Sequence, residues 1–219
     1  MTLPVACGHG SAAGFVLAGG ESSRMGRDKA LVELDGRPLV EHVLGTLRES
    51  GLEARIAGAR SDLKSYAPVI EDPGGGPLSG ICAALASCEA ELAVFVPVDM
   101  PLVPPKLLEY LVFHARMTGA AVTVPSALGR AETFPAVVDR LALPVLQETL
   151  EAHTGGCFAA FARAAERLGR PIAVVAVEEL AQCGQVMHPL GVPAGQWLRN
   201  VNTPEDLTLA EALVCGNFA

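Results

Sequence analysis

The sequence predicts an α/β fold in which a mostly parallel central sheet is covered by helices on both faces. Short apolar runs of strand length alternate along the chain with segments whose apolar residues recur at helical spacing. The run at residues 92–98 (LAVFVPV) is apolar throughout, as expected for a strand that is buried on both faces. A chain of 219 residues is also long enough to bury one large α/β core without disulfide bonds.

The elements follow in order along the chain. The first strand is expected at residues 14–18, and the first helix at 38–49, with Pro38 near its first position. Further strands are expected at 54–57, 68–71, 92–98, 121–125, 135–138 and 172–177, and further helices at 77–87, 105–117, 143–151 and 157–168. The last helix should begin after Thr203 as N-cap, with Pro204 in its first turn and Asp206 three residues past the cap. We expect residues 1–12 to be a flexible N-terminal segment and residues 13–219 to form a single domain.

Composition and charge narrow the classes of partner. A net charge of -8 argues against nucleic acid and anionic membranes as partners, although a local basic loop can still hold one small anion. The six cysteines are scattered without a CxxC pair, and no apolar stretch reaches the length of about 18 residues that a membrane span requires. The N-terminus also lacks the basic and apolar regions of a signal peptide. We therefore expect a cytoplasmic protein with reduced thiols, which binds neither nucleic acid nor membrane.

The stretch LAGGESSRMGRDKAL, residues 17–31, is expected to bind a polyphosphate. It follows the first strand, and ligands of open α/β sheets bind beyond the carboxyl ends of strands. Gly19 and Gly20 allow a ligand to approach the main chain, where successive N–H groups can hold an anion, while Arg24 and Lys29 add positive charge. The spacing matches neither a P-loop nor the GxGxxG dinucleotide motif. A solvated, charged turn is the alternative interpretation.

Two acidic residues follow strands at the same expected edge. Asp99 ends the buried strand at 92–98, where a carboxylate can bind Mg²⁺ between nucleotide phosphates. Asp72 ends another strand before a glycine-rich turn. Either residue could instead be a turn former or a helix cap.

At this point the sequence resembles the nucleotidyltransferases of the molybdenum cofactor guanylyltransferase type. Their hallmark, LAGGxSxRMGxDKxL after the first strand, matches residues 17–31, and three later landmarks match in order: residues 69–80 (VIEDPGGGPLSG), 98–101 (VDMP) and 200–207 (NVNTPEDL). The resemblance implies a single Rossmann-like domain of the nucleotide-diphospho-sugar transferase type. It also implies Mg²⁺-dependent transfer of GMP from GTP to the terminal phosphate of molybdopterin, or of its molybdenum-loaded form, with release of pyrophosphate. Transient contact with molybdoenzymes or with other cofactor-biosynthesis proteins is a further implication.

The same resemblance assigns roles to individual residues. It implies catalytic roles for Arg24, Lys29 and Asp99, and metal ligation by Asp99 and Asn202. It also implies nucleotide binding by Leu17, Ala18, Gly19, Gly20, Lys29, Asp72, Gly80 and Asp99. The acceptor would lie near residues 130–135, where Arg130 either faces its phosphate or is a solvated loop cation.

Two features bear on the choice of nucleotide. The loop before the last expected helix, called the late loop below, carries Asn200 and Asn202. Cytidylyltransferases and sugar-phosphate nucleotidyltransferases of similar fold present a carboxylate in this loop, so the asparagines favour GTP as the nucleotide. Ala57 and Ala59 stand near the position where the guanylyltransferases often place an asparagine beside the base, which leaves CTP or another nucleotide open. A different phosphorylated acceptor and a noncatalytic nucleotide-binding partner in cofactor delivery also stay open.

Overall fold

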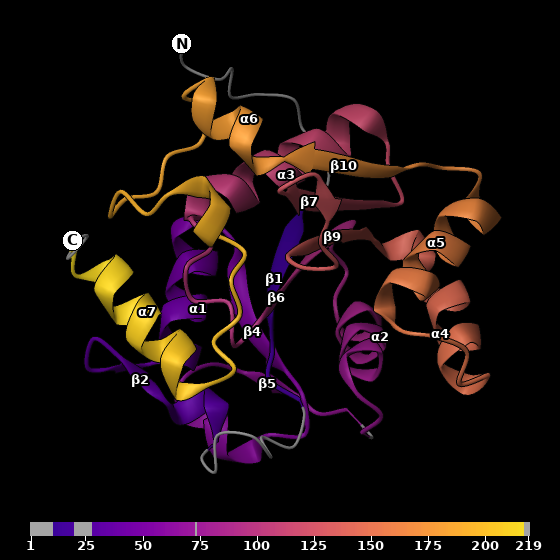
Figure 1. The fold of residues 1–219 in the computed structure, drawn as a ribbon. Coiled ribbons are helices and arrows are strands. Elements are labelled where there is room, and N and C mark those ends of the chain that lie inside the picture. The colour runs from indigo at the N-terminus through magenta and orange to yellow at the C-terminus, as the bar shows by residue number, and fades with distance from the viewer. Residues whose placement is uncertain (1–10, 20–27, 73, 217–219) are drawn as a thin grey trace.

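The computed structural model describes residues 11–19, 28–72 and 74–216, and its centre is one eight-stranded sheet (Figure 1). The strands lie in the order β10-β7-β9-β6-β1-β4-β5, with β8 paired to β7. Their bounds are β1 (Ala12–Leu17), β4 (Glu53–Ala57), β5 (Val69–Ile70), β6 (Leu92–Pro97), β7 (Val122–Ala127), β8 (Arg130–Ala131), β9 (Ala136–Asp139) and β10 (Ile172–Ala176). A separate small hairpin is formed by β2 (Glu33–Leu34) and β3 (Arg37–Pro38).

Helices cover both faces of the sheet, as the apolar strands require. One face carries α1 (Leu39–Glu49), α3 (Pro105–Thr118), α6 (Val177–Gln182) and α7 (Pro204–Val214). The other carries α2 (Pro77–Ser87), α4 (Leu143–Glu151) and α5 (Cys157–Leu168). Side chains of β6 alternate between the two hydrophobic cores: Val94 and Val96 face the first, whereas Phe95 faces the second and stacks on Phe15 at 5.5 Å between ring centroids.

The predicted fold class is confirmed, with local differences. The helices expected at 77–87, 143–151 and 157–168 have the predicted bounds. β1 starts at Ala12, one residue before the expected domain boundary, because Ala12 already pairs with Leu92 of β6. The strand expected to reach residue 177 ends at Ala176, where α6 begins without any capping side chain to mark it.

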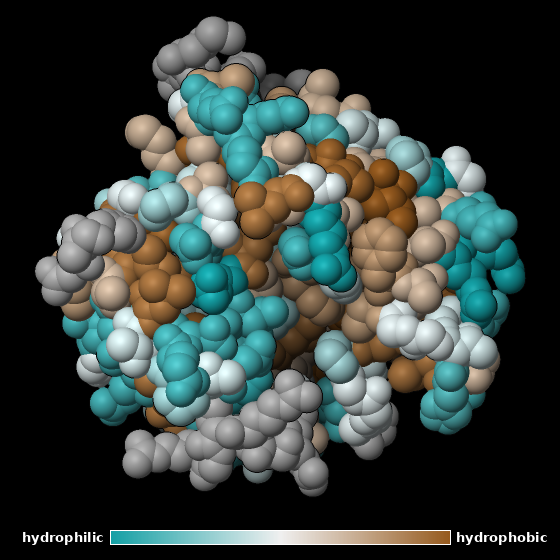
Figure 2. Space-filling view, in the orientation of Figure 1, coloured by the Kyte–Doolittle hydropathy of each residue, from teal (hydrophilic) through white to brown (hydrophobic). Residues whose placement is uncertain are grey.

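The topology brings several loops to one edge of the sheet. β1, β4 and β6 are parallel neighbours, so their carboxyl ends lie side by side. β9 runs antiparallel to β6 and β7, and its amino end therefore lies at the same edge. The face of the molecule seen in Figure 2 is hollowed near its centre, with hydrophobic residues in the hollow. Within the described residues no helix is both long and apolar enough to cross a membrane.

Candidate active site

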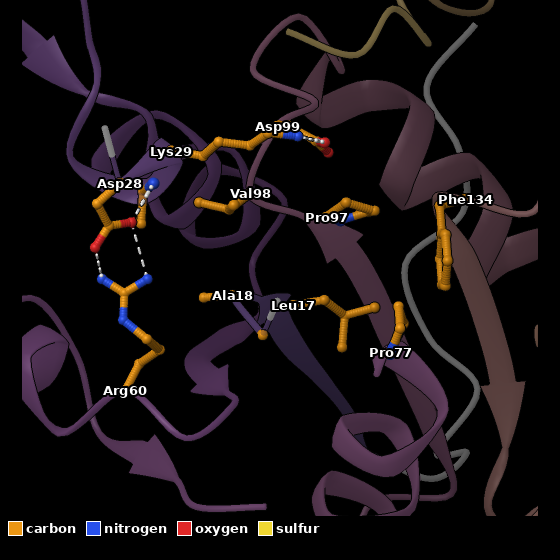
Figure 3. A pocket seen from close by; sticks show the side chains of 12 residues that line it. Leu17, Ala18, Asp28, Lys29, Arg60, Pro77, Pro97, Val98, Asp99 and Phe134 are labelled. Atoms are coloured by element: carbon orange, nitrogen blue, oxygen red, sulfur yellow. Dashed lines mark hydrogen bonds and ion pairs between the residues drawn. The ribbon is translucent and has the colours of Figure 1, made fainter. Parts of the chain in front are cut away.

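Three side chains from distant parts of the sequence meet at this edge. The Lys29 ammonium donates to Asp99 Oδ2 at 3.3 Å and also to Asn202 Oδ1 (Figure 3 shows the first of these contacts). The Lys29 and Asp99 side chains keep only 23% and 20% of their exposure, so both charges are partly removed from water and attract one another more strongly than a surface pair would. The Lys29 ammonium is thus contacted by one carboxylate oxygen and one amide oxygen.

The late loop is held in place by backbone contacts and a helix cap. The Val201 N–H donates to the Asp99 carbonyl at 2.8 Å, which ties the loop to the end of β6. At the start of α7, Thr203 Oγ1 accepts from the Asp206 N–H at 3.2 Å, and Asp206 Oδ2 accepts from the N–H groups of Asn202 and Thr203 at 3.1 and 3.0 Å. This capping box confirms the predicted helix start and fixes the backbone of Asn202.

The same contacts change the ionisation of Asp206. Burial opposes its charged form, but the hydrogen bonds from Asn202 and Thr203, together with the charge of Arg199, outweigh burial and lower the pKa of this carboxyl below its ordinary value. The loop that carries Asn202 is therefore held by hydrogen bonds to an ionised carboxylate.

A cavity opens beside the three side chains. It is lined by residues from the end of β1, the start of the short 3-10 helix η1 (Lys29–Leu31), the loops after β4 and β6, the first residue of α2 and the residue before Pro135. The lining residues are Leu17, Ala18, Gly19, Asp28, Lys29, Ala30, Arg60, Pro77, Pro97, Val98, Asp99 and Phe134. Five of the residues expected to bind nucleotide are thus in one place.

Two further predicted residues, Asp72 and Gly80, lie next to this lining. A Cβ atom on Gly80 would lie 3.2 Å from Asp72 Oδ2, and one on Gly19 would lie 3.8 Å from the same oxygen. The Asp72 carboxylate also accepts from the Gly74 N–H at 2.7 Å, which fixes its orientation. Asp72 is therefore held between Gly19 and Gly80, and the absence of a side chain at residue 80 makes room for it.

The main chain of Gly58 lies close to Ala18 and Gly19, where the loop expected to bind a polyphosphate begins (residues 19–28, called the phosphate loop below). Its φ is +152°, and a Cβ atom there would lie 3.0 Å from the Gly19 nitrogen and 3.2 Å from the Ala18 carbonyl carbon. A glycine is needed here both for the backbone conformation and for the close approach. Ala57 is buried in the core beside α2, whereas Ala59 is exposed, so neither side chain lines the cavity.

Other predicted residues lie elsewhere. Gly20 and Arg24 are outside the described part of the chain. Asn200 is exposed, so of the two late-loop amides it is Asn202 that reaches Lys29. Arg130 is exposed in β8 and is absent from the lining of the cavity. Trp197 is buried, and its indole donates to the Val192 carbonyl at 2.7 Å, which is a packing role.

Sequence reasoning assigned no role to two charged residues of the lining, Asp28 and Arg60, whereas Phe134 belongs to residues 130–135, where the acceptor was expected. The uncharged lining residues Ala30, Pro77, Pro97 and Val98 were not predicted either. Asp28 accepts from the Ala30 N–H at 3.0 Å and so caps η1, and the Arg60 guanidinium donates to both oxygens of its carboxylate (Figure 3). The Asp-Lys pair at the end of the motif in residues 17–31 was a usable signal for Asp28. For Arg60 the sequence carries no spacing signal, because its loop meets the site only through the order of strands in the sheet.

The site offers oxygen atoms that can bind a metal ion and positive charge that can bind phosphate, rather than a thiol nucleophile. Burial, which is the main cause for both, raises the pKa of the Cys82 and Cys157 thiols to about 11, so neither is a nucleophile at neutral pH. Among the residues that the structure places, no group of three or more His, Cys, Asp and Glu side chains forms a metal site. The oxygens of Asp99 and Asn202 nonetheless fit Mg²⁺, which proteins commonly hold with one or two side chains while substrate phosphates and water complete the shell.

Comparison with known proteins places this geometry in a family. Residues 14–195 match the family model described as the MobA-like NTP transferase domain. The chain belongs to this family. A molybdenum cofactor guanylyltransferase of Rhodobacter capsulatus is 34% identical over 209 residues, which cover 91% of this chain and 94% of that one. One from Xanthomonas euvesicatoria pv. vesicatoria is 35% identical over 153 residues, covering 64% and 80%.

Solved structures agree with the MobA-like assignment. Molybdopterin-guanine dinucleotide biosynthesis protein A from Archaeoglobus fulgidus superposes with a TM-score of 0.74 at 26% identity, covering 94% of this chain and all of that one. The 2-C-methyl-D-erythritol 4-phosphate cytidylyltransferase of Thermus thermophilus superposes with a TM-score of 0.64 at 19% identity, over 92% of this chain and 98% of that one, and shows a shared fold. The chain is thus a nucleotidyltransferase in fold and family.

Proposed function

We propose that this protein transfers GMP from GTP to the terminal phosphate of molybdopterin, or of its molybdenum-loaded form, and releases pyrophosphate. Its relatives at 34–35% identity carry the name molybdenum cofactor guanylyltransferase. The observation that carries the proposal is the meeting of Lys29, Asp99 and Asn202 beside a cavity lined in part by residues 17–19 at the end of β1. This arrangement supports a site for a nucleoside triphosphate with a divalent cation.

The reaction needs little covalent chemistry from the protein. An oxygen of the acceptor phosphate attacks the α-phosphorus of GTP in line, the new P–O bond forms, and the bond to the pyrophosphate oxygen breaks. The acceptor oxygen is already ionised, so no general base is required, and catalysis consists of positioning and charge stabilisation. Leu17 belongs to β1 and the Ala18 N–H donates to the Ala57 carbonyl at 3.1 Å, so the backbone N–H groups that would hold the phosphates begin at Gly19. Lys29 and Arg24 would offset the negative charge that builds on the α-phosphoryl group and on the leaving pyrophosphate.

Magnesium is part of this proposal. Asp99 and Asn202 would hold the ion, and a bound Mg²⁺ would supply charge neutralisation between phosphate oxygens. In the described structure Lys29 contacts both of these oxygens. We infer that nucleotide and metal binding redirects the lysine toward phosphate.

The two late-loop asparagines give a matched test of the metal. Asn202→Ala should raise the Mg²⁺ concentration for half-maximal turnover by roughly tenfold, since it removes one of two side-chain ligands. Asn200→Ala removes an exposed amide of the same loop and should leave it unchanged. Equal Mg²⁺ dependence in the two variants would count against Asn202 as a ligand.

The test of the reaction is pyrophosphate release with purified molybdopterin, with GTP, CTP, ATP and UTP supplied separately. Turnover with GTP alone is expected, and Asp99→Asn should lower it by at least about a hundredfold. Glu109→Gln, which removes an exposed ion pair with Lys106 on α3, is the control and should behave as wild type. Turnover with CTP instead would keep the reaction class and replace the base, in line with the lack of amide side chains at residues 57 and 59. Nucleotide binding without turnover would favour a noncatalytic partner.

A further inference from the structure

The loop after β4 carries an arginine whose guanidinium is clamped between two carboxylates. Arg60 Nη1 donates to Asp28 Oδ1 at 2.9 Å, and Nη2 donates to Asp28 Oδ2. On its other edge, Nε donates to Asp62 Oδ1 at 2.9 Å and Nη2 to Asp62 Oδ2 at 2.7 Å. The bidentate geometry of an arginine with each carboxylate fixes the plane of the guanidinium.

This clamp is partly protected from water. The Arg60 side chain retains 17% of its exposure, against 37% for Asp28. Hydrogen bonding to Asp62 is the largest effect, and together with the contacts to Asp28 it raises the pKa of the guanidinium above its ordinary value in spite of burial. Most of the N–H donors of Arg60 are therefore used inside the protein, which argues against Arg60 as the group that reads the base or grips a phosphate.

Asp28, the residue that Arg60 holds, sets the position of Lys29. Its Oδ1 accepts from the Ala30 N–H at 3.0 Å, and its carbonyl accepts from the Leu31 N–H at 3.0 Å, so Asp28 is the N-cap of η1 and Lys29 is the first residue of that helix. The side chain that leaves this turn reaches Asp99 and Asn202. A change in the Asp28 carboxylate would therefore move the origin of the Lys29 side chain.

Residues 58–60 also contact the other flank of the phosphate loop. Gly58 lies against the backbone of Gly19, and Arg60 holds Asp28. Gly19 and Asp28 are the described residues on either side of residues 20–27. One tripeptide thus fixes both ends of the phosphate loop relative to β4.

We propose that Arg60 is a positioning residue for catalysis, which acts through Asp28 to hold Lys29 and the end of the phosphate loop in register with Asp99. The inference rests on the proposed nucleotidyl transfer and names a residue that this function alone does not require. Arg60 lines the cavity, but most of its N–H donors are bound to Asp28 and Asp62, so its removal should lower kcat more than it weakens GTP binding.

The test compares Arg60→Gln, Arg60→Lys, Asp28→Asn and the double variant Asp28→Asn/Arg60→Gln. Arg60→Gln should lower kcat by roughly 10- to 100-fold with a change of less than about threefold in the Kd of GTP, as for other outer-shell partners. The double variant should be no slower than the worse single variant, because both changes break one unit. Arg60→Lys keeps the positive charge but cannot make the bidentate contacts, so its kcat should lie between those of wild type and Arg60→Gln. Arg55→Gln is the matched control: Arg55 lies on the same β4 and pairs with Glu53 at the surface, and it should keep wild-type turnover.

A second readout does not depend on the substrate. Hydrogen exchange at the Ala30 amide, whose acceptor is Asp28, should become at least about tenfold faster in Arg60→Gln and stay unchanged in Arg55→Gln. Wild-type protein without turnover would refute the proposed function and leave this readout to decide the role of Arg60. Turnover of Arg60→Gln within twofold of wild type, additive effects in the double variant, or a raised Kd of GTP with unchanged kcat would each overturn the positioning role. If Arg60→Gln fails to fold, Arg60→Lys and Asp28→Asn carry the same comparison.

Discussion

Replacement of Gly58 by alanine tests whether the close approach of Gly58 to Gly19 supports the nucleotide site. The residue has φ +152°, its N–H donates to the Ile70 carbonyl at 3.0 Å, and its carbonyl accepts from the Arg60 N–H at 2.8 Å. These hydrogen bonds keep the backbone from relaxing, so Gly58→Ala should be strained by about 1–3 kcal/mol from its conformation alone. The new Cβ would also lie 3.0 Å from the Gly19 nitrogen, and overpacking of this kind adds roughly 1 kcal/mol or more.

Gly119→Ala provides the matched control. Gly119 ends α3 with φ +61°, and a Cβ atom there would meet nothing within 4 Å. This variant carries a left-handed backbone penalty of about 1–2 kcal/mol without a steric one. The difference between the two variants isolates the close approach of the β4 loop to the phosphate loop.

Urea unfolding and calorimetry of GTP binding give the two readouts. We expect Gly58→Ala to lose about 2–4 kcal/mol of unfolding free energy and to bind GTP at least about tenfold more weakly, because the Gly19 N–H is displaced. Gly119→Ala should lose less stability and bind GTP normally. Equal destabilisation with unchanged GTP affinity in both variants would refute the view that Gly58 supports the nucleotide site.

Three further outcomes follow from the site and its cap. Lys29→Ala should lower turnover by roughly 10² to 10³, about 3–4 kcal/mol, in steady-state kinetics, while Lys64→Ala, at an exposed pair with Glu71, should not; near-normal turnover of Lys29→Ala would rule out the charge-stabilising role. Thr203→Ala removes half of the capping box and should cost about 1 kcal/mol, or about 2–4 °C in Tm, by scanning calorimetry; an unchanged Tm would contradict it. The folded-state pKa of Asp206 lies below its ordinary value of 3.8, so its carboxylate stabilises the fold above that pH and the contribution is lost as pH falls through the folded pKa. Asp206→Asn should therefore be less stable than wild type at pH 7, and urea unfolding should show the gap closing below about pH 4; a constant gap would show that ionisation is irrelevant.

The sequence predicted the layers of the fold because the longer strands and helices have local signatures, whereas β2, β3, β8 and α6 were not predicted. The apolar run of β6, buried on both faces, and the proline-led starts of α2 and α7 were readable without tertiary information. The antiparallel insertion of β9 was not, since strand direction depends on pairing partners that lie far away in sequence.

The candidate site divides in the same way. Gly19, Lys29 and Asp99 were predictable because they follow strands and have the side chains that phosphate chemistry needs. Asn202, rather than Asn200, was expected as a ligand from the resemblance, and the structure adds its contact with Lys29 and the capping box of α7 that fixes its backbone. Arg60 required knowledge that β4 lies next to β1, which places its loop beside Asp28.

The hydrogen bond from the Val201 N–H to the Asp99 carbonyl has a consequence for how such a site can diverge. The match to the family model ends at residue 195, so Asn202 is supplied by chain outside the matched core, while Asp99 is supplied from within it. A segment attached to the core through the backbone can exchange its side chains without disturbing that attachment. The side chain at residue 202 can therefore change from an amide to a carboxylate while the backbone attachment and the sheet stay intact, whereas Trp197 and Val201 of the same segment are buried in the core and must be kept.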